Sequence, residues 1–291
     1  MAMKRVGAIS FLAGEDSPLS AVIDTAAGFA YFGTGTYPCI VVKVDLSTFQ
    51  RVSAITLPAD DGVPYSAVID TAAGFAYFGT DASPSRVIKV DLSTFTMAGA
   101  ITLPADDGEP LSAVIDTAAG FAYFGTGTLP GHVVKVDLST FQRVSAITLP
   151  AGEDLGTYAV IDTAAGFAYF CTDTSPSRVI KVDLSTFQRV SAITLPAGEG
   201  SAAAAVIDTE AGFAYFGTNT YPGRVVKVGL APFSQAGAIT LSAGEDDPLS
   251  AVIDTAAGFA YFGCDAYPCI VVKVAVGALV KVDHLMLMGV H

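Results

Sequence analysis

The feature that most constrains the fold is the segment AVIDTAAGFAYFGT, which first occupies residues 21–34. It returns at residues 67, 113, 159, 205 and 251, always 46 residues after the previous copy, and no copy differs from it by more than one residue. A fixed period of this length is typical of solenoids, propellers and other repeat architectures. The chain therefore reads as one unit repeated six times.

The first unit contains four short apolar segments, at residues 20–24, 29–34, 40–46 and 51–57, separated by turns or loops. β-branched and aromatic residues dominate these segments, and none has a helical period. One four-stranded antiparallel sheet per 40–50 residues is the pattern of a propeller blade. We therefore predict an all-β, six-bladed β-propeller with a 46-residue repeat, forming a single domain over residues 1–291.

The two ends of the chain offer one outer strand too many. Residues 5–12 align with the fourth strand of the repeat, and residues 281–288 occupy the same repeat position. We expect residues 5–12 to complete the last blade, because they keep the repeat sequence whereas residues 275–291 diverge from it. A local hairpin forms more readily than a long-range pairing, which favours the C-terminal segment instead.

Charge and hydropathy exclude several classes of partner. The net charge of −13 disfavours nucleic acids and anionic membranes, which require basic surfaces. No apolar run is long enough to span a bilayer, and the N-terminus does not read as a signal peptide. The four cysteines are not spaced as metal ligands, so we expect free thiols in a reducing compartment. We also expect a monomer.

One acidic position recurs in the loop that precedes each blade. Such loops cross one face of the ring, so these carboxylates would form a ring at a channel mouth. Hard divalent cations bind carboxylate oxygens, which makes this ring a candidate binding site, although a solvated polar loop explains it equally simply. No other cofactor is indicated. The residues are Glu15, Asp61, Asp107, Glu153, Glu199 and Glu245.

Two further charged positions recur in every repeat. Asp24 and its equivalents precede a turn that ends in glycine, so we expect their carboxylates to accept hydrogen bonds from the turn backbone. Lys43 and its equivalents lie in the middle of the third strand, and a partly buried lysine requires a partner. We expect that partner to be a carboxylate, either Asp45 or Asp24.

A candidate contact patch arises from differences between repeats. Repeats 1 and 6 carry a Cys-Ile pair where other repeats have a basic residue, and these two blades become neighbours if the ring closes. Two exposed pairs side by side would form a small apolar surface for a protein or small-ligand partner. The residues are Cys39, Ile40, Cys269 and Ile270.

The order of turns and strands resembles the YVTN-type repeat of the large propeller superfamily. The corresponding pieces here are residues 24–28, 31–34 and 44–47, although the YVTN motif itself appears only as Tyr-Phe-Gly-Thr. This resemblance implies a propeller. Its members include surface-layer modules, lactonases and proteins without a known role, so it constrains function only weakly.

The sameness of the repeats argues against an enzyme. General acid–base catalysis needs groups whose environments separate their pKa values, and near-identical blades supply near-identical environments. We therefore expect a non-catalytic scaffold that binds a partner or a cation through its faces. The alternatives are a structural or engineered repeat protein without a ligand and a metal-dependent, lactonase-like hydrolase.

Overall fold

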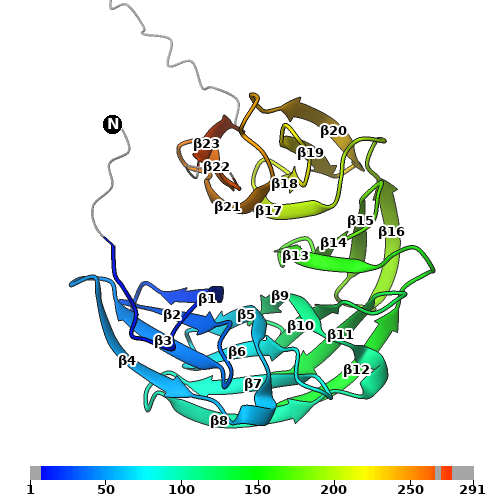
Figure 1. Ribbon diagram of the computed structural model, residues 1–291. Coiled ribbons are helices and arrows are strands. Elements are labelled where there is room, and N and C mark those ends of the chain that lie inside the picture. Colours follow the sequence, from blue (N-terminus) through cyan, green and yellow to red (C-terminus); the bar gives the residue numbers. More distant parts are fainter. Residues whose placement is uncertain (1–7, 266–269, 277–291) are drawn as a thin grey trace, which may run out of the picture.

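The computed structural model describes residues 8–265 and 270–276. It arranges them as six antiparallel sheets around a central axis, which Figure 1 views nearly end-on. In each sheet the strands follow one another in chain order from the axis outward, and the innermost strands of successive blades contact each other. The predicted six-bladed propeller is therefore confirmed.

Five blades have four strands and the last has three among the described residues. There is no α-helix in the described ranges, only the short 3-10 turns η1 (Ala59–Asp61) and η2 (Ala105–Asp107). Blade by blade, the strands are β1 (Pro18–Asp24), β2 (Phe29–Thr34), β3 (Ile40–Asp45) and β4 (Gln50–Thr56); β5 (Pro64–Asp70), β6 (Phe75–Thr80), β7 (Arg86–Asp91) and β8 (Thr96–Thr102); β9 (Pro110–Asp116), β10 (Phe121–Thr126), β11 (His132–Asp137) and β12 (Gln142–Thr148); β13 (Leu155–Asp162), β14 (Phe167–Thr172), β15 (Arg178–Asp183) and β16 (Gln188–Thr194); β17 (Ala202–Asp208), β18 (Phe213–Thr218), β19 (Arg224–Leu230) and β20 (Phe233–Thr240); and β21 (Pro248–Asp254), β22 (Phe259–Cys264) and β23 (Ile270–Ala275).

Local side-chain hydrogen bonds fix the turns on one face of the ring. The carboxylate of Asp24 accepts a hydrogen bond from the backbone N–H of Ala27, at 2.8 Å, and the same bond occurs in all six blades. Gly28 closes the turn with a φ of 80°, a conformation that favours glycine. The predicted structural role of Asp24 and its equivalents is thus confirmed.

The turn between the third and fourth strands depends on a second aspartate. In blade 2, Asp91 accepts hydrogen bonds from the hydroxyl of Ser93 and from the backbone N–H groups of Ser93 and Thr94. These bonds lower the pKa of Asp91 to about 2. The same sequence, Asp-Leu-Ser-Thr-Phe, begins this turn in blades 1 to 4 but not in blades 5 and 6.

The core consists of five similar interfaces between neighbouring blades. Between blades 1 and 2, for example, Tyr31 and Val41 pack against Phe78 and Ile88, and all four are essentially inaccessible to solvent. The other four interfaces bury the equivalent residues. Both faces of each inner sheet are thereby covered, which explains why the second and third strands of the repeat are apolar on both sides.

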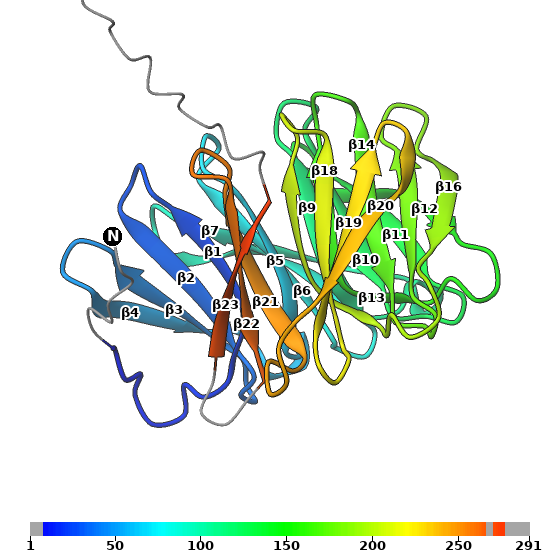
Figure 2. The same ribbon diagram turned by 90° about the horizontal axis from the view of Figure 1, so that it is seen from above.

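At each of the two ends of the array, one face of the terminal blade has no neighbouring blade packed on it among the described residues. Val271 of blade 6 is 54% exposed, whereas its equivalent Val41 in blade 1 is fully buried. At the other end, Ile23 of blade 1 is 51% exposed. Figure 1 shows the wider separation between β21–β23 and β1–β4, and Figure 2, turned by 90°, shows that the loops gather at the two ends of the strands.

The N-terminal segment lies against the uncovered face of blade 1. Residues 8–12 are not part of a β-sheet, and the ring of Phe11 packs edge-on against Phe32 with centroids 5.8 Å apart. Residues 1–7 and 277–291 lie outside the described residues, which include the alternative strand at 281–288. That residues 5–12 complete the last blade therefore stays a prediction.

Candidate functional site

The two faces of the ring differ in how much the blades vary. One face, which we call the turn face, carries the nearly invariant turns after the first strands and the turns after the third strands, which share one sequence in blades 1 to 4. The other face, which we call the loop face, carries the loops between the second and third strands and the loops that lead from one blade to the next. These loops differ in sequence from blade to blade. Because recognition residues are usually placed on variable loops of a rigid scaffold, the loop face is the candidate site.

The predicted acidic ring belongs to the loop face, but the structure does not leave it open to solvent. Five of its carboxylates are buried, and Asp61 has no exposed surface at all. Only Glu245 is partly exposed. The expectation of a solvated carboxylate ring at a channel mouth is therefore not met at these five positions, because each carboxylate is enclosed beneath its own loop.

Each buried carboxylate is paired with a basic side chain of the blade that follows it. Its partner lies either at the start of the third strand or in the fourth strand, and blades 3 and 4 use both positions. Among the described residues the pairs are Glu15–Arg51, Asp61–Arg86, Asp107–His132, Asp107–Arg143, Glu153–Arg178, Glu153–Arg189 and Glu199–Arg224. These residues tie the loop between blades to the sheet.

The pairs differ in how completely their polar atoms are hydrogen-bonded. Glu15 accepts hydrogen bonds from Arg51 and from the backbone N–H of Leu12, and the Arg51 bond is the main reason that its pKa is lowered. Burial instead raises the pKa of Asp61, against the opposing effect of Arg86. One oxygen of Asp61 and the Nε of Arg86 have no hydrogen-bond partner among the described residues.

The candidate contact patch is not an exposed surface in the described part of the chain. Cys39 is 1% exposed, and burial raises its pKa to about 12. Ile40 and Ile270 are only partly exposed, and Cys269 lies outside the described residues. The Cys39 thiol packs into the interface between blades 1 and 2, so it cannot present the apolar contact expected from the sequence.

The exposed apolar groups of the loop face are different residues, which the sequence analysis did not identify. Tyr37, Leu129 and Tyr221 stand at equivalent positions in the loops of blades 1, 3 and 5, and are 70%, 81% and 75% exposed. Blades 2 and 4 have serine at this position. The alternation of large and small residues before the loop proline was a readable signal, because large exposed apolar side chains on one face often mark a contact surface.

Exposed carboxylates share the loop face with these side chains. Asp60, Asp106, Glu109 and Asp173 lie in loops of the same face and are exposed. None of the four makes an ion pair within 4.0 Å among the described residues. The loop face therefore combines exposed aromatic and aliphatic tips with uncompensated negative charge.

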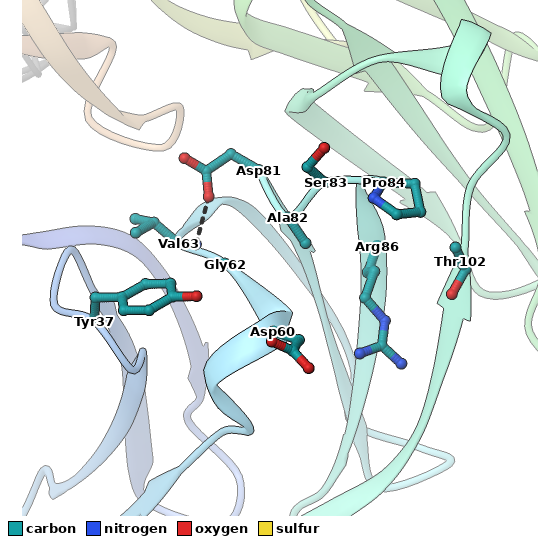
Figure 3. Close-up of a pocket in the computed structure, with 10 residues that line it drawn as sticks. All are labelled: Tyr37, Asp60, Gly62, Val63, Asp81, Ala82, Ser83, Pro84, Arg86 and Thr102. Atoms are coloured by element: carbon teal, nitrogen blue, oxygen red, sulfur yellow. Dashed lines mark hydrogen bonds between the residues drawn. The ribbon is translucent and has the colours of Figure 1, made fainter.

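A cavity of about 610 Å³ opens on this face between blades 1 and 2. Figure 3 shows Tyr37 at one end of it and Arg86 and Thr102 at the other, with Asp60 and Asp81 between them in this view. Asp81 accepts a hydrogen bond from the backbone N–H of Val63 at 2.6 Å, which connects the loop between blades 1 and 2 to the β6–β7 loop of blade 2. The lining is mixed, with apolar groups such as Val63 and Pro84 beside charged groups of both signs.

The recurring lysines, one in the third strand of each blade, have aromatic rather than acidic partners. The Nζ of Lys43 lies 3.9 Å from the ring centroid of Phe29, with Tyr31 and Phe95 farther away. All six lysines repeat the contact with the equivalent phenylalanine. No lysine–carboxylate pair within 4.0 Å occurs among the described residues, so the expected carboxylate partner is replaced by cation–π contacts.

In the ranges that the structure describes, no three His, Cys, Asp or Glu side chains are grouped in a way that could bind a metal ion. Within those ranges there is also no helix of the length and apolarity needed to cross a membrane.

Comparisons with known proteins support the fold. No protein-family model and no curated protein sequence matches the chain. Among solved structures, it is similar to hydrazine synthase of Kuenenia stuttgartiensis, with a TM-score of 0.62 and 12% sequence identity over 95% of this chain and 100% of that chain. At this identity the similarity concerns the fold alone.

Proposed function

We propose that the chain is a non-catalytic propeller scaffold whose loop face binds a basic segment of a partner protein. The observation that carries this proposal is that the differences between blades concentrate on one face, where they expose large apolar side chains among unpaired carboxylates. The turns after the first strands stay almost constant, and the turns after the third strands share one sequence in blades 1 to 4. Variation confined to one face is the expected result of a scaffold that presents a recognition surface.

The chemistry of the loop face suggests what it binds. Tyr37, Leu129 and Tyr221 supply exposed contact area of the kind that anchors protein interfaces. Exposed carboxylates such as Asp60 and Asp106 favour a partner with lysine or arginine, and complementary charge accelerates association. A flexible basic segment with interspersed aromatic or aliphatic residues satisfies both requirements.

Three features support a non-catalytic scaffold over an enzyme. The blades have near-identical interfaces, the five buried carboxylates of the acidic ring are paired with arginine or histidine, and the recurring lysines contact aromatic rings. Each recurring charged group thus has a structural partner. We retain the resemblance to the YVTN-type repeat within this proposal, on residues 31–34 and 44–47, since that family includes modules without catalysis.

The test is a binding titration with a defined probe. A fluorescent, unstructured peptide in which Lys-Tyr pairs alternate with Gly-Ser spacers is titrated with the protein, and a peptide with glutamate in place of lysine is the control. We expect saturable binding of the lysine peptide that weakens as salt rises, because exposed charges are screened. Equal binding of both peptides, or none of either, would refute the proposal.

Variants taken from the repeat itself locate the surface. Tyr37→Ser and Leu129→Ser copy the serine found in blades 2 and 4, so the fold should tolerate them. Their combination is expected to weaken peptide binding several-fold. Glu210→Gln removes an exposed charge from the turn face and is the matched control, with unchanged affinity expected. If Glu210→Gln weakens binding and the double variant does not, the wrong face has been assigned.

A further inference from the structure

Blade 5 departs from the repeat at the turn between its third and fourth strands. In blades 1 to 4 the phenylalanine of this turn has a positive φ between 49° and 52°. Blade 5 reads Gly-Leu-Ala-Pro-Phe from Gly229 to Phe233 in place of Asp-Leu-Ser-Thr-Phe, and Phe233 is not among the residues with positive φ. The turn therefore has a different conformation and lacks the carboxylate that begins it in blades 1 to 4.

A cavity of about 420 Å³ lies between this altered turn and blade 4. Residues of the turn, among them Gly229 and Pro232, form one wall. Phe167 and Tyr169 of blade 4 and Phe213 of blade 5 supply aromatic surface, and Lys181 and Asp162 also line the cavity. The cavity opens on the turn face, away from the surface proposed to bind a partner.

The amine of Lys181 is held by apolar surroundings. Its Nζ lies 3.7 Å from the ring centroid of Phe167 and 5.5 Å from that of Phe233. Its hydrogen-bond acceptor is the carbonyl oxygen of Leu230, at 3.4 Å. No carboxylate of the described residues comes within 4.0 Å. Burial lowers the pKa of Lys181, while Asp162 and Asp183 act in the opposite direction. A larger share of neutral amine follows from this balance.

We propose that Lys181 is a covalent binding site for small apolar aldehydes. The neutral amine attacks the carbonyl carbon and forms the C–N bond. The C=O π bond breaks as this bond forms, and proton transfer from nitrogen to oxygen gives the neutral carbinolamine. Its hydroxyl takes up a proton and leaves as water, which forms the protonated imine, and the imine then releases its nitrogen proton to solvent, so that there is no net oxidation or reduction. The apolar walls of the cavity accommodate the body of the aldehyde, and they lower the free energy of the neutral amine relative to the ammonium form.

The five equivalent lysines serve as internal controls for the reactivity of Lys181. Each contacts the phenylalanine of its own blade at 3.6–3.9 Å, so an aromatic neighbour alone does not distinguish Lys181. What distinguishes it is the neighbouring turn of blade 5. The triple variant Gly229→Asp/Ala231→Ser/Pro232→Thr restores the sequence of blades 1 to 4 and should remove the special environment while preserving a turn that the fold already uses.

The experiment labels the folded protein with benzaldehyde and sodium cyanoborohydride, which reduces each imine to a stable amine. Peptide mass spectrometry then measures labelling at Lys181 and at the five equivalent lysines. We expect several-fold more rapid labelling at Lys181 than at any of the five, and a fall to their level in the triple variant. Uniform labelling of the six lysines in the unmodified protein would overturn the proposal without reference to any variant. Unchanged labelling in a folded triple variant would overturn it as well.

Discussion

Replacing Arg86 with isoleucine tests the buried ion pairs of the loop face most sharply. Asp61 is completely buried, and Arg86 is its ion-pair partner among the described residues. Blade 1 already carries isoleucine at this position, as Ile40, where its carboxylate is held by Arg51 instead. The substitution therefore introduces a side chain that the blade can accommodate, and its main effect is to leave Asp61 without a counter-ion.

The expected cost follows from the burial of the pair. Removing one member of a buried ion pair costs about 3–5 kcal/mol, because the other charge stays desolvated. The Arg86 side chain is 26% exposed, which places the cost toward the lower end. A cost of about 3 kcal/mol lowers the Tm of a chain of this size by roughly 6–12 °C.

Two further variants provide the control and the rescue. Arg178→Ile removes the equivalent arginine of blade 4, where Glu153 keeps Arg189 at 2.5 Å, so the cost should stay below about 1 kcal/mol. Adding Met97→Arg to Arg86→Ile recreates the arrangement of blade 1 and should recover most of the loss. The assay is thermal and urea unfolding followed by circular dichroism.

The pH dependence of the Arg86→Ile cost provides an internal check. Burial already raises the pKa of Asp61, and loss of Arg86 raises it further. The native state of the variant then binds a proton more readily than the unfolded chain, so the cost grows as pH rises from about 4 toward neutrality. Equal destabilisation by Arg86→Ile and Arg178→Ile, or a cost independent of pH, would refute the reasoning.

Three more outcomes can be measured on the same preparations. A Cβ added at Gly79 would lie 2.7 Å from the Cβ of Pro110 in the next blade, so Gly79→Ala should lower the free energy of unfolding by about 1–3 kcal/mol. Gly237 has open space around it, so Gly237→Ala should not lower it. The turn holds the pKa of Asp91 at about 2, below its ordinary value of 3.8, so its stabilising effect is present above pH 4 and is lost as pH falls toward 2. The urea midpoint of the native protein should therefore exceed that of Asp91→Asn by less as pH falls over that range. A difference between the two midpoints that does not change with pH would contradict this. If residues 5–12 complete the last blade, Ile9→Cys and Val271→Cys should form an intramolecular disulfide under mild oxidation, since the equivalent residues of blade 1 are cross-strand partners; a monomer without the cross-link would contradict that closure.

Much of the fold could be predicted because the same turn and strand sequences occur in all six repeats. The Asp24 turn depends on residues within three positions of one another, so its hydrogen bond was readable from the sequence. The blade order followed from the 46-residue period and the strand pattern. Both predictions rest on short-range geometry, which one repeat already contains.

The environment of the recurring charges was harder to predict. Lys43 pairs across the strands with Tyr31 and reaches Phe95 of the next blade, contacts that depend on register and on blade packing. The burial of the acidic ring was likewise missed. A signal was available, because each carboxylate from Glu15 to Glu199 is followed by a basic residue either 25 or 36 positions later. That spacing joins each loop to the sheet of its own blade, and Asp61 with Arg86 is one example.

Hydrogen–deuterium exchange in the presence of the lysine–tyrosine peptide tests the central claim most directly. The claim is that the constant strands form a scaffold and the variable loop face binds the partner. The account predicts slower exchange at the loops of residues 35–39, 81–85 and 127–131 when the peptide is bound, with no change at the turns of residues 24–28, 70–74 and 116–120. Protection of those turns while the loops exchange as before would contradict it.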